Sequence, residues 1–175
     1  METSIVQLII QNRIGFLDRI FVFFGQEYYL IPLAIFIYGI IYCKSDDKQR
    51  VLLLIRRTIV AMALYMFISE LVLRNIFYRP RPFLAIDNIT LLGKEVTNSS
   101  FPSGHATFSM IYCYMLVLFD KKFIPLAIFF VFMISFSRIY TGHHWPSDVV
   151  AGMILGILYD HLAIFLIDKF EKKVK

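Results

Sequence analysis

The sequence predicts an all-α protein, a polytopic membrane helix bundle with about five transmembrane helices and an N-terminal helix in the membrane interface. Hydrophobic residues make up 58% of its 175 residues, well above the roughly 45–50% that is usual in soluble domains. Most of them gather in long stretches that carry few charges, as membrane-spanning helices require. The basic residues between these stretches form short clusters, which is typical of the loops of membrane proteins.

The predicted elements follow from the apolar stretches in chain order. Residues 4–24 have apolar side chains at helix-like spacing, interrupted by polar residues such as Asn12 and Arg13, so we expect a helix lying in the interface. A poorly formed sixth span is the alternative for this segment. The five spans are expected at residues 28–43, 58–69, 106–119, 123–137 and 149–167. Several are shorter than the roughly 20 residues that cross the hydrocarbon core, so flanking residues must extend them.

Positive charge is concentrated in three segments that a bundle of five spans places on one side of the membrane. These are residues 44–57, residues 120–122 and the tail from Lys169 onward. Because cytoplasmic loops are enriched in lysine and arginine, we expect this side and the C-terminus in the cytoplasm. The loops of residues 74–103 and 138–148 then face the extracytoplasmic side. They contain nearly all the residues that are capable of chemistry.

Composition also limits the partners and the number of domains. The net charge is +5, but the basic residues are scattered and no soluble region presents them as a patch, so nucleic acid is not expected as a partner. No internal repeat, linker or low-complexity tract divides the chain. We therefore expect a single membrane-embedded domain over residues 1–175, and the sequence predicts no oligomeric state.

Three of the outward segments contain residues that are capable of chemistry. The first lies at the end of the second predicted span. It contains Arg74, Arg79 and Arg81, whose guanidinium groups can donate paired hydrogen bonds to an oxyanion. The positive-inside bias disfavours arginine on this side, so the cluster indicates a local use for its charge. Arginines that reach the lipid headgroups are the alternative when this segment is considered alone.

The second segment, from Phe101 to His105, opens the third predicted span. Ser103 and Gly104 precede the helix, where a hydroxyl, accessible N–H groups and the positive end of the helix dipole suit a phosphate. An imidazole ordinarily titrates near neutral pH, so we expect His105 to protonate a departing oxygen. An ordinary helix cap is the alternative for this segment.

The third segment leads into the fifth predicted span and contains His143, His144 and Asp148. If Pro146 begins the helix, Asp148 is placed to accept the ring N–H of His144. That bond would fix the tautomer and leave the other ring nitrogen to attack, as in a catalytic triad with a histidine nucleophile. A metal site on the two histidines is the alternative, but adjacent histidines diverge and no carboxylate or cysteine cluster completes a zinc site.

Taken together, the three segments resemble a known signature. The motifs are Arg74-x6-Arg81-Pro82, Pro102-Ser103-Gly104-His105 and Ser137-Arg138-x5-His144-x3-Asp148. Their order and spacing resemble those of type 2 phosphatidic-acid phosphatases, which share their site with vanadium haloperoxidases. The resemblance is close over about residues 70–150. The chain departs from the pattern at Arg74, where the family usually has lysine, and this keeps the charge but changes the donor geometry.

The resemblance implies a role for each matching residue. His144 would attack phosphorus, His105 would protonate the leaving group and Asp148 would orient His144. The phosphate would be bound by Arg74, Arg81, Ser103, Gly104 and Arg138. A phosphohistidine would form and be hydrolysed by water, with positive charge around the phosphate in the place of a metal ion. Neither a metal nor another cofactor is therefore expected.

The same resemblance implies a lipid phosphate in the bilayer as the substrate. The runs at residues 78–83 and 99–103 look like those of bacterial undecaprenyl-diphosphate phosphatases, although Gly104 stands where some of these enzymes carry aspartate. Undecaprenyl diphosphate is thus the expected substrate, and phosphatidylglycerophosphate, phosphatidate and a lipid A phosphate are alternatives. A haloperoxidase, a non-catalytic lipid-binding membrane protein and a lipid transporter are alternatives from other classes.

Four further polar residues receive structural interpretations. Glu70 lies inside the second span, one helical turn before Arg74, and we expect it to form a supporting ion pair with that arginine. Asp160 and His161 lie deep in the fifth span, where polar contacts between helices are expected. His143 is expected to form part of the wall of the pocket.

Overall fold

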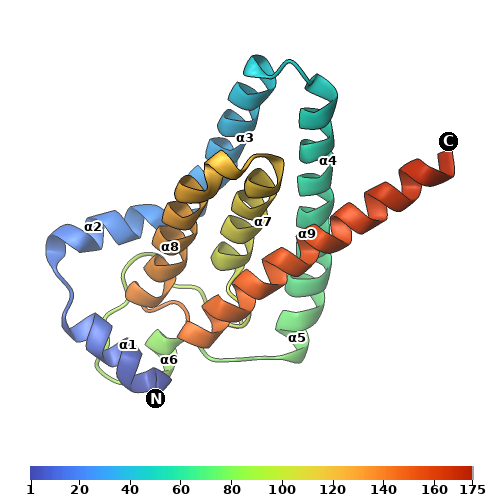
Figure 1. Cartoon of the computed structure of the whole chain (residues 1–175). Helices are drawn as coiled ribbons and strands as arrows, with labels where there is room; N and C mark the ends of the chain where they lie inside the picture. Colours follow the sequence, from blue (N-terminus) through green and yellow to red (C-terminus); the bar gives the residue numbers. More distant parts are fainter. Residues whose placement is uncertain (175) are drawn as a thin grey trace.

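The structure, a computed structural model, describes residues 1–174; the side chains of residues 27–30 and 174 lie outside the described part, as does the whole of Lys175. Within residues 1–174 every regular element is a helix (Figure 1), which confirms the predicted all-α class. The elements are α1 (Glu2–Gln11), α2 (Gly15–Phe24), α3 (Glu27–Lys44), α4 (Lys48–Tyr65), the π-helix η1 (Met66–Leu73), α5 (Arg74–Ile76), α6 (Pro82–Ala85), α7 (Gly104–Phe119), the 3₁₀-helix η2 (Lys121–Phe123), α8 (Ile124–Tyr140) and α9 (Pro146–Val174).

The apolar helices coincide with the five predicted spans. Among the described residues, three helices are long and apolar enough to cross a membrane, namely Lys48–Ile76, Lys121–Tyr140 and Pro146–Lys173. The first of these joins α4, η1 and α5 into one helix of 29 residues, so flanking residues do extend the predicted span. Two shorter apolar helices, Ile31–Lys44 and Gly104–Phe119, account for the other spans. The start of the first predicted span falls among residues whose side chains are not described.

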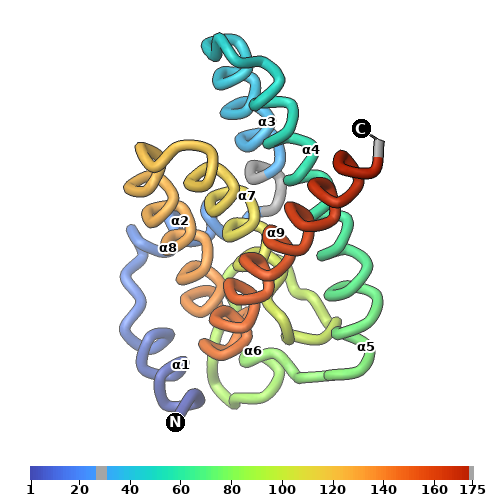
Figure 2. Tube along the Cα trace, turned by 45° about the vertical axis from the view of Figure 1, so that its right-hand side comes forward, coloured from blue at the N-terminus to red at the C-terminus, as the bar shows by residue number. Residues whose placement is uncertain are grey.

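Helix α7 forms the centre of the bundle, packed against α4, α8 and α9 (Figures 1 and 2). One buried cluster joins α4, α7 and α9 and consists of Ala61, Tyr65, Ile111, Tyr159 and Ala163. Large apolar side chains such as Ile35, Phe67 and Phe132 point outward and are exposed. An outward apolar surface is stable in lipid, whose chains are as apolar as the side chains.

Two glycines let α9 approach α7 closely. A Cβ atom at Gly152 would lie 2.6 Å from the carbonyl oxygen of Ser103, and one at Gly156 would lie 2.8 Å from Cβ of Met110. Small residues four positions apart commonly permit close helix contacts in membranes. At the start of the two helices, the backbone N–H of Ser103, the N-cap of α7, donates to the carbonyl of Asp148 in the first turn of α9 at 3.1 Å. This contact therefore brings two of the three motifs together.

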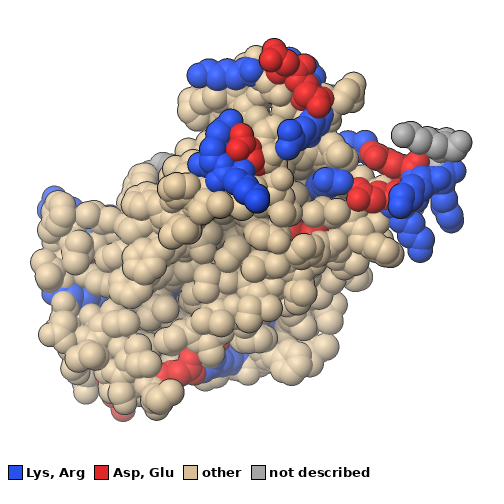
Figure 3. Space-filling model, viewed as in Figure 1, with Lys and Arg blue, Asp and Glu red and all other residues tan. Residues whose placement is uncertain are grey.

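The basic segments and the motif-bearing loops lie toward opposite ends of the bundle. The turn between α3 and α4, the turn at η2 and the end of α9 lie toward one end, and the loops of residues 77–103 and 141–145 toward the other (Figures 1 and 2). Figure 3 shows lysine and arginine side chains gathered over the first of these ends. The three basic segments thus share one side of the bundle, as the sequence predicts.

The N-terminal segment differs from its prediction. The single helix expected over residues 4–24 is wrong, because the chain forms α1 and α2 with a break between them. At the break, the side-chain amide of Asn12 donates to the carbonyl of Leu8 at 2.8 Å, and Nε of Arg13 donates to the carbonyl of Tyr140 at 2.9 Å. The chain therefore turns to bind the end of α8. Each ten-residue helix rises about 15 Å, half of the hydrocarbon thickness, so neither forms a sixth span.

Candidate active site

A cavity of about 380 Å³ lies at the end of the bundle where the three motifs meet. Six of the eight predicted site residues line it, namely Arg74, Arg81, Gly104, His105, Arg138 and His144. The other two, Ser103 and Asp148, are fully buried beside it. A second cavity, of about 610 Å³, lies under the loop of residues 92–98 and shares Val96, Asn98, His105 and Arg138 with the first.

The donor set of the cavity suits an anion. Its charged lining comprises the arginines and Glu70, and guanidinium groups are strong donors to phosphate oxygens. Among the described residues, no group of three or more histidine, cysteine, aspartate or glutamate residues is placed to hold a metal ion. The cavity is therefore best matched to an oxyanion.

Glu70 holds Arg74 at the end of the second span. Nη1 of Arg74 pairs with Oε2 of Glu70 at 2.6 Å, and Nη2 donates to the carbonyl of Pro102 at 3.3 Å. The hydroxyl of Tyr65 donates to the other oxygen of Glu70. The predicted ion pair is thus confirmed. It lies in the π-helical stretch Met66–Leu73, and such wide turns are frequent at functional sites.

The first residues of α7 leave room and hydrogen-bonding capacity for a ligand. Ser103 occupies the N-cap position, yet its Oγ caps nothing and is buried without a hydrogen-bond partner among the described residues. Such a hydroxyl costs about 1–3 kcal/mol, which an oxyanion at the helix N-terminus would offset. A Cβ atom at Gly104 would lie 2.6 Å from Oη of Tyr65 and 3.1 Å from Nη2 of Arg74. Any side chain at position 104 therefore requires Tyr65 and Arg74 to shift.

Arg81 joins the loop before α7 to the loop before α9. Its side chain is buried, and its Nε and Nη2 atoms donate to the carbonyl and the side-chain oxygen of Asn98 at 3.0 and 2.7 Å. Nη2 also reaches the carbonyl of Ser99 at 3.2 Å. Nη1 donates to the carbonyl of His143 at 3.0 Å and lies 3.2 Å from Nε2 of His144. A forked guanidinium can serve all these acceptors, whereas a lysine ammonium cannot.

The contacts of His144 settle its tautomer. Nδ1 lies 2.7 Å from the carbonyl oxygen of Ser100, and a carbonyl can only accept, so Nδ1 carries the proton. Nε2 therefore has a free electron pair, which accepts the N–H of Arg81 in the absence of substrate. Because His144 lines the cavity, this is the nitrogen that a nucleophilic role requires.

The predicted hydrogen bond from His144 to Asp148 is wrong. Oδ2 of Asp148 lies 3.8 Å from Nδ1 of His144, and the ring N–H is directed to Ser100 instead. Asp148 is the third residue of α9, and its Oδ2 accepts the backbone N–H of Trp145 at 2.9 Å. This is the reciprocal bond of a capping box. The carboxylate thus caps its own helix and reaches His144 only through its charge.

Arg138 and His105 complete the cavity from α8 and α7. Arg138 lies in the last turn of α8, and its Nη1 donates to the carbonyl of Gly25 at 2.7 Å. This bond ties the end of α2 to the site. His105 is the second residue of α7 and lines both cavities. The two residues therefore stand where the two cavities meet.

The sequence did not single out Asn98 and Ser100 as parts of the site. Both lie just before the Phe101–His105 motif. Ser100 acts through its backbone carbonyl, and Asn98 acts through its carbonyl and its side-chain oxygen. A carbonyl has no side-chain signature, so residue type carries no signal for this role. The only hint was the polar run that directly precedes the motif.

His143 forms part of the wall of the second cavity, as expected. Its Nε2 lies 3.0 Å from the carbonyl of Lys94, and its Nδ1 lies 2.8 Å from Oγ1 of Thr141. Burial and the nearby charge of Arg138 lower the pKa of His143 to about 3. Burial, Arg138 and Arg81 also hold the pKa of His144 well below its usual range. Both imidazoles are therefore neutral at neutral pH.

Acidification should destabilise the folded protein through these two histidines. In the unfolded chain they take up protons near pH 6.5, but in the folded protein only at much lower pH. Below pH 6.5 the unfolded state binds more protons, so the free energy of unfolding falls as pH falls, by at most about 1.4 kcal/mol per pH unit for each histidine. Thermal unfolding in detergent between pH 7.5 and 4.5 measures this slope.

The matched variant for this prediction is His143→Gln, which removes one titrating histidine. Its Tm should fall less steeply with decreasing pH than that of the wild type. Equal slopes in the two proteins would show that His143 does not withhold a proton in the folded state.

The fold and the cavity define the class of the protein. A membrane helix bundle that gathers arginines and buried histidines around an oxyanion cavity matches the site expected of a membrane phosphatase. The chain belongs to the PAP2 superfamily, whose family model matches residues 54–172. This confirms the resemblance on which the sequence-based expectations rest.

Comparisons with individual proteins agree with the family. The chain is 29% identical to an undecaprenyl-diphosphatase of Sulfolobus acidocaldarius over 99% of its own length and 84% of the relative's. It is also 29% identical to the undecaprenyl-diphosphatase BcrC of Bacillus subtilis, over 83% and 72% of the two chains. The crystal structure of Aquifex aeolicus LpxE superposes with a TM-score of 0.72 and 28% identity, covering 92% of this chain and 93% of the other.

Proposed function

We propose that the protein is a lipid phosphatase that converts undecaprenyl diphosphate to undecaprenyl phosphate and inorganic phosphate, with His144 as the nucleophile. One observation carries the proposal: the unprotonated Nε2 of His144 belongs to a cavity lined by Arg74, Arg81 and Arg138. The names of the two relatives described above support the choice of lipid.

In the first proposed step, the electron pair on Nε2 of His144 attacks the terminal phosphorus of the diphosphate. The bond between that phosphorus and the bridging oxygen breaks, and His105 donates a proton to the departing oxygen. In the second step, a water molecule attacks the phosphohistidine while His105 takes up its proton. Inorganic phosphate leaves, and His144 returns to its neutral state.

The chain's own groups stabilise the charge of the transferred phosphoryl group in this scheme. The three arginines surround its oxygens, and the hydroxyl of Ser103 and the backbone N–H of Gly104 meet it at the start of α7. Preorganised donors of this kind stabilise a phosphoryl transition state. The carbonyl of Ser100 retains the proton on Nδ1 of His144 throughout. We propose no metal ion and no other cofactor.

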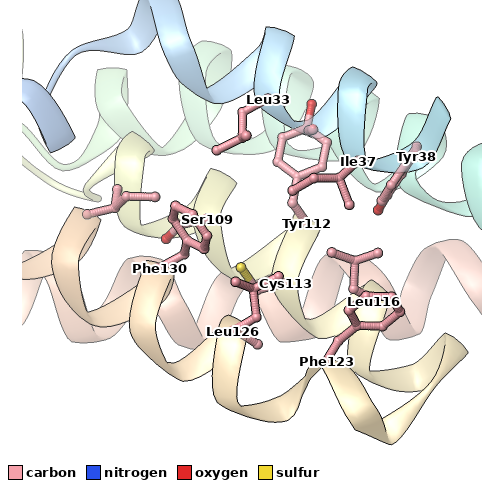
Figure 4. Close-up of a pocket in the computed structure, with 13 residues that line it drawn as sticks. Leu33, Ile37, Tyr38, Ser109, Tyr112, Cys113, Leu116, Phe123, Leu126 and Phe130 are labelled. Atoms are coloured by element: carbon pink, nitrogen blue, oxygen red, sulfur yellow. The ribbon is translucent and has the colours of Figure 1, made fainter. Parts of the chain in front are cut away.

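We propose that the lipid chain reaches the cavity along a path of apolar side chains. The cavity itself is lined in part by Ile31, Met66, Phe108 and Tyr112. Tyr112 also lines a narrow crevice of about 50 Å³ between α3, α7 and α8 (Figure 4). Leu33 and Ile37 line this crevice from α3, and Leu126 and Phe130 line it from α8. An isoprenoid chain that follows this path stays in apolar surroundings while its phosphates reach the arginines.

Phosphate release from a panel of purified lipids tests the proposal. Undecaprenyl diphosphate should give a kcat/KM at least about tenfold above those of phosphatidylglycerophosphate, phosphatidate and a lipid A phosphate. Turnover should persist in EDTA. A higher kcat/KM for another lipid would overturn the substrate but not the class. Loss of activity in EDTA that one divalent cation restores would overturn the metal-free mechanism.

We also propose that the site faces the extracytoplasmic side and that the C-terminus is cytoplasmic. The support is the gathering of the three basic segments at the opposite end of the bundle (Figure 3). In a Cys43→Ser background, Asp87→Cys should react with a membrane-impermeant maleimide in intact cells. The matched exposed residue Asp46, replaced by cysteine, should react only after permeabilisation. The reverse pattern would invert the topology.

A further inference from the structure

Asp148 is a fully buried carboxylate whose closest partners do not include His144. Its Oδ1 accepts Nη1 of Arg79 at 2.6 Å, and its Oδ2 accepts the backbone N–H of Trp145 at 2.9 Å. Nδ1 of His144 lies 3.8 Å from Oδ2. A charge removed from water needs a counter-ion nearby. In this structure Arg79 is the counter-ion of Asp148.

Arg79 is shared between two carboxylates. Its Nη2 pairs with Oε2 of Glu2 at 2.6 Å, opposite the nitrogen that binds Asp148. Nη1 also donates to Oγ of Ser147 at 2.7 Å, and the guanidinium lies 5.1 Å from the ring centroid of Trp145. The planar fork of arginine permits this double pairing, because its two terminal nitrogens bind separate acceptors.

Glu2 is itself held in place by α9. Its Oε1 accepts the backbone N–H of Ser147, in the first turn of α9, at 2.8 Å. A carboxylate at a helix N-terminus is favoured by the helix dipole. Helix α1 is further fastened here by an apolar cluster of Val6, Ile10, Ile86 and Trp145. The negative charge of Glu2 therefore has a fixed place in the site, although the residue lies at the other end of the sequence.

We propose that Arg79 and Glu2 are positioning residues for His144 that act through Asp148. Arg79 withdraws the carboxylate of Asp148 from Nδ1 of His144 and offsets its charge there. Glu2 weakens the effect of Arg79 on Asp148, because its carboxylate pairs with Nη2 of the same guanidinium group. The inference rests on the proposed nucleophilic role of His144.

The chemistry of the reaction makes this charge balance matter. When Nε2 bonds to phosphorus while Nδ1 keeps its proton, the imidazole ring becomes positively charged. A negative charge 3.8 Å away stabilises that ring but also favours protonation of the free histidine, which removes its nucleophilic electron pair. Arg79 and Glu2 thus set a compromise between a stable intermediate and an available nucleophile.

The other charged and titratable groups around His144 do not belong to this network. Those that line the same cavity or act on the imidazole come from every element packed around it: Tyr65 from α4, Glu70 from η1, Arg74 from α5, Arg81 from the segment before α6, His105 and Tyr112 from α7, Arg138 from α8 and the adjacent His143. All of them are retained in the variants below. A change in the behaviour of His144 can then be assigned to Glu2, Arg79 and Asp148.

The pH dependence of kcat/KM for undecaprenyl diphosphate tests the proposal. In Arg79→Gln the acid limb should move to higher pH by about one unit, because a cation near His144 is lost. In Glu2→Gln it should move to lower pH, because Arg79 then acts on Asp148 alone. Arg79→Lys keeps the charge and should lie between the wild type and Arg79→Gln. The matched controls are Arg56→Gln and Glu171→Gln, an exposed pair distant from the site, which should leave the limb unchanged.

A second measurement separates this inference from the proposed function. In protein labelled with ¹⁵N-histidine, the ring nitrogens of His144 report its protonation without any turnover, and a His144→Asn sample assigns their signals. The midpoint of this titration should move in opposite directions in Arg79→Gln and Glu2→Gln. Unchanged midpoints, or shifts in the same direction, would overturn the proposal even if the lipid is hydrolysed. Opposite shifts without phosphate release would support the network and overturn the function. If Arg79→Gln does not fold, the proposal is tested by Glu2→Gln alone, in which the midpoint of the His144 titration should move to lower pH.

Discussion

Replacement of His144 with alanine should abolish phosphate release from undecaprenyl diphosphate, lowering kcat by about 10⁴-fold or more. The variant lacks Nε2 of His144, which is unprotonated because Nδ1 donates to the carbonyl of Ser100, and which lies next to Arg81. Radiolabel from the terminal phosphate should be trapped on the wild type, quenched in alkaline denaturant, as an adduct that is stable in alkali and labile in acid. It should be absent from the variant.

Binding and a matched histidine variant control this experiment. The affinity for substrate should change little in His144→Ala, because the arginines that line the cavity remain. His161→Ala should keep nearly normal turnover, since His161 contacts Tyr114 at 3.1 Å and does not line the cavity. Normal phosphate release by His144→Ala would rule out the mechanism, whatever the outcome of the lipid panel.

Arg81→Met should cause the second large loss. We expect kcat to fall by about 10³-fold, because the variant lacks a cation that stabilises the phosphoryl group. The folded protein should also lose stability. The buried carbonyls of Ser99 and His143 lose a donor, and each unsatisfied buried group costs about 1–3 kcal/mol. Phosphate release and Tm in detergent measure the two effects.

Arg81→Lys separates charge from geometry at this position. Lysine keeps the positive charge but cannot donate to both loops, so we expect partial recovery of kcat and little recovery of Tm. Arg57→Lys, in an ion pair with Asp168 near the opposite end of the bundle, controls for the general effect of this substitution. If Arg81→Lys matched the wild type in both kcat and Tm, the paired hydrogen bonds of the guanidinium group to the two loops would contribute to neither turnover nor stability.

The sequence predicted the bundle well because the membrane reduces the problem to local patterns. A long apolar run in lipid must form a helix to satisfy its own backbone, so each predicted span coincides with an apolar helix. Successive spans cross the membrane in alternate directions, and this order places the three motifs at the same end of the bundle. The ion pair of Arg74 with Glu70 was also predictable, because the two residues lie one helical turn apart.

The predictions that were wrong depended on distant partners. Residues 4–24 form two helices because Arg13 binds the carbonyl of Tyr140, 127 positions away. The ring N–H of His144 is directed to the carbonyl of Ser100, 44 positions away, and not to the nearby Asp148. Spacing along one helix identified Asp148 as a neighbour of His144. It did not show that the carboxylate of Asp148 accepts hydrogen bonds from Arg79 and from the backbone N–H of Trp145 instead.

The sequence by itself determined the helical membrane bundle, its apolar spans and the residues that surround the oxyanion cavity. Only the tertiary structure decided which nitrogen of His144 carries the proton and which groups share the charge of Asp148. The physical reason is the range of the forces involved. Helix formation in lipid depends on the polarity of a continuous segment, whereas a tautomer depends on a single donor or acceptor about 3 Å away. In this protein that acceptor comes from the loop before α7, and only the packing of α7 against α9 brings it to His144.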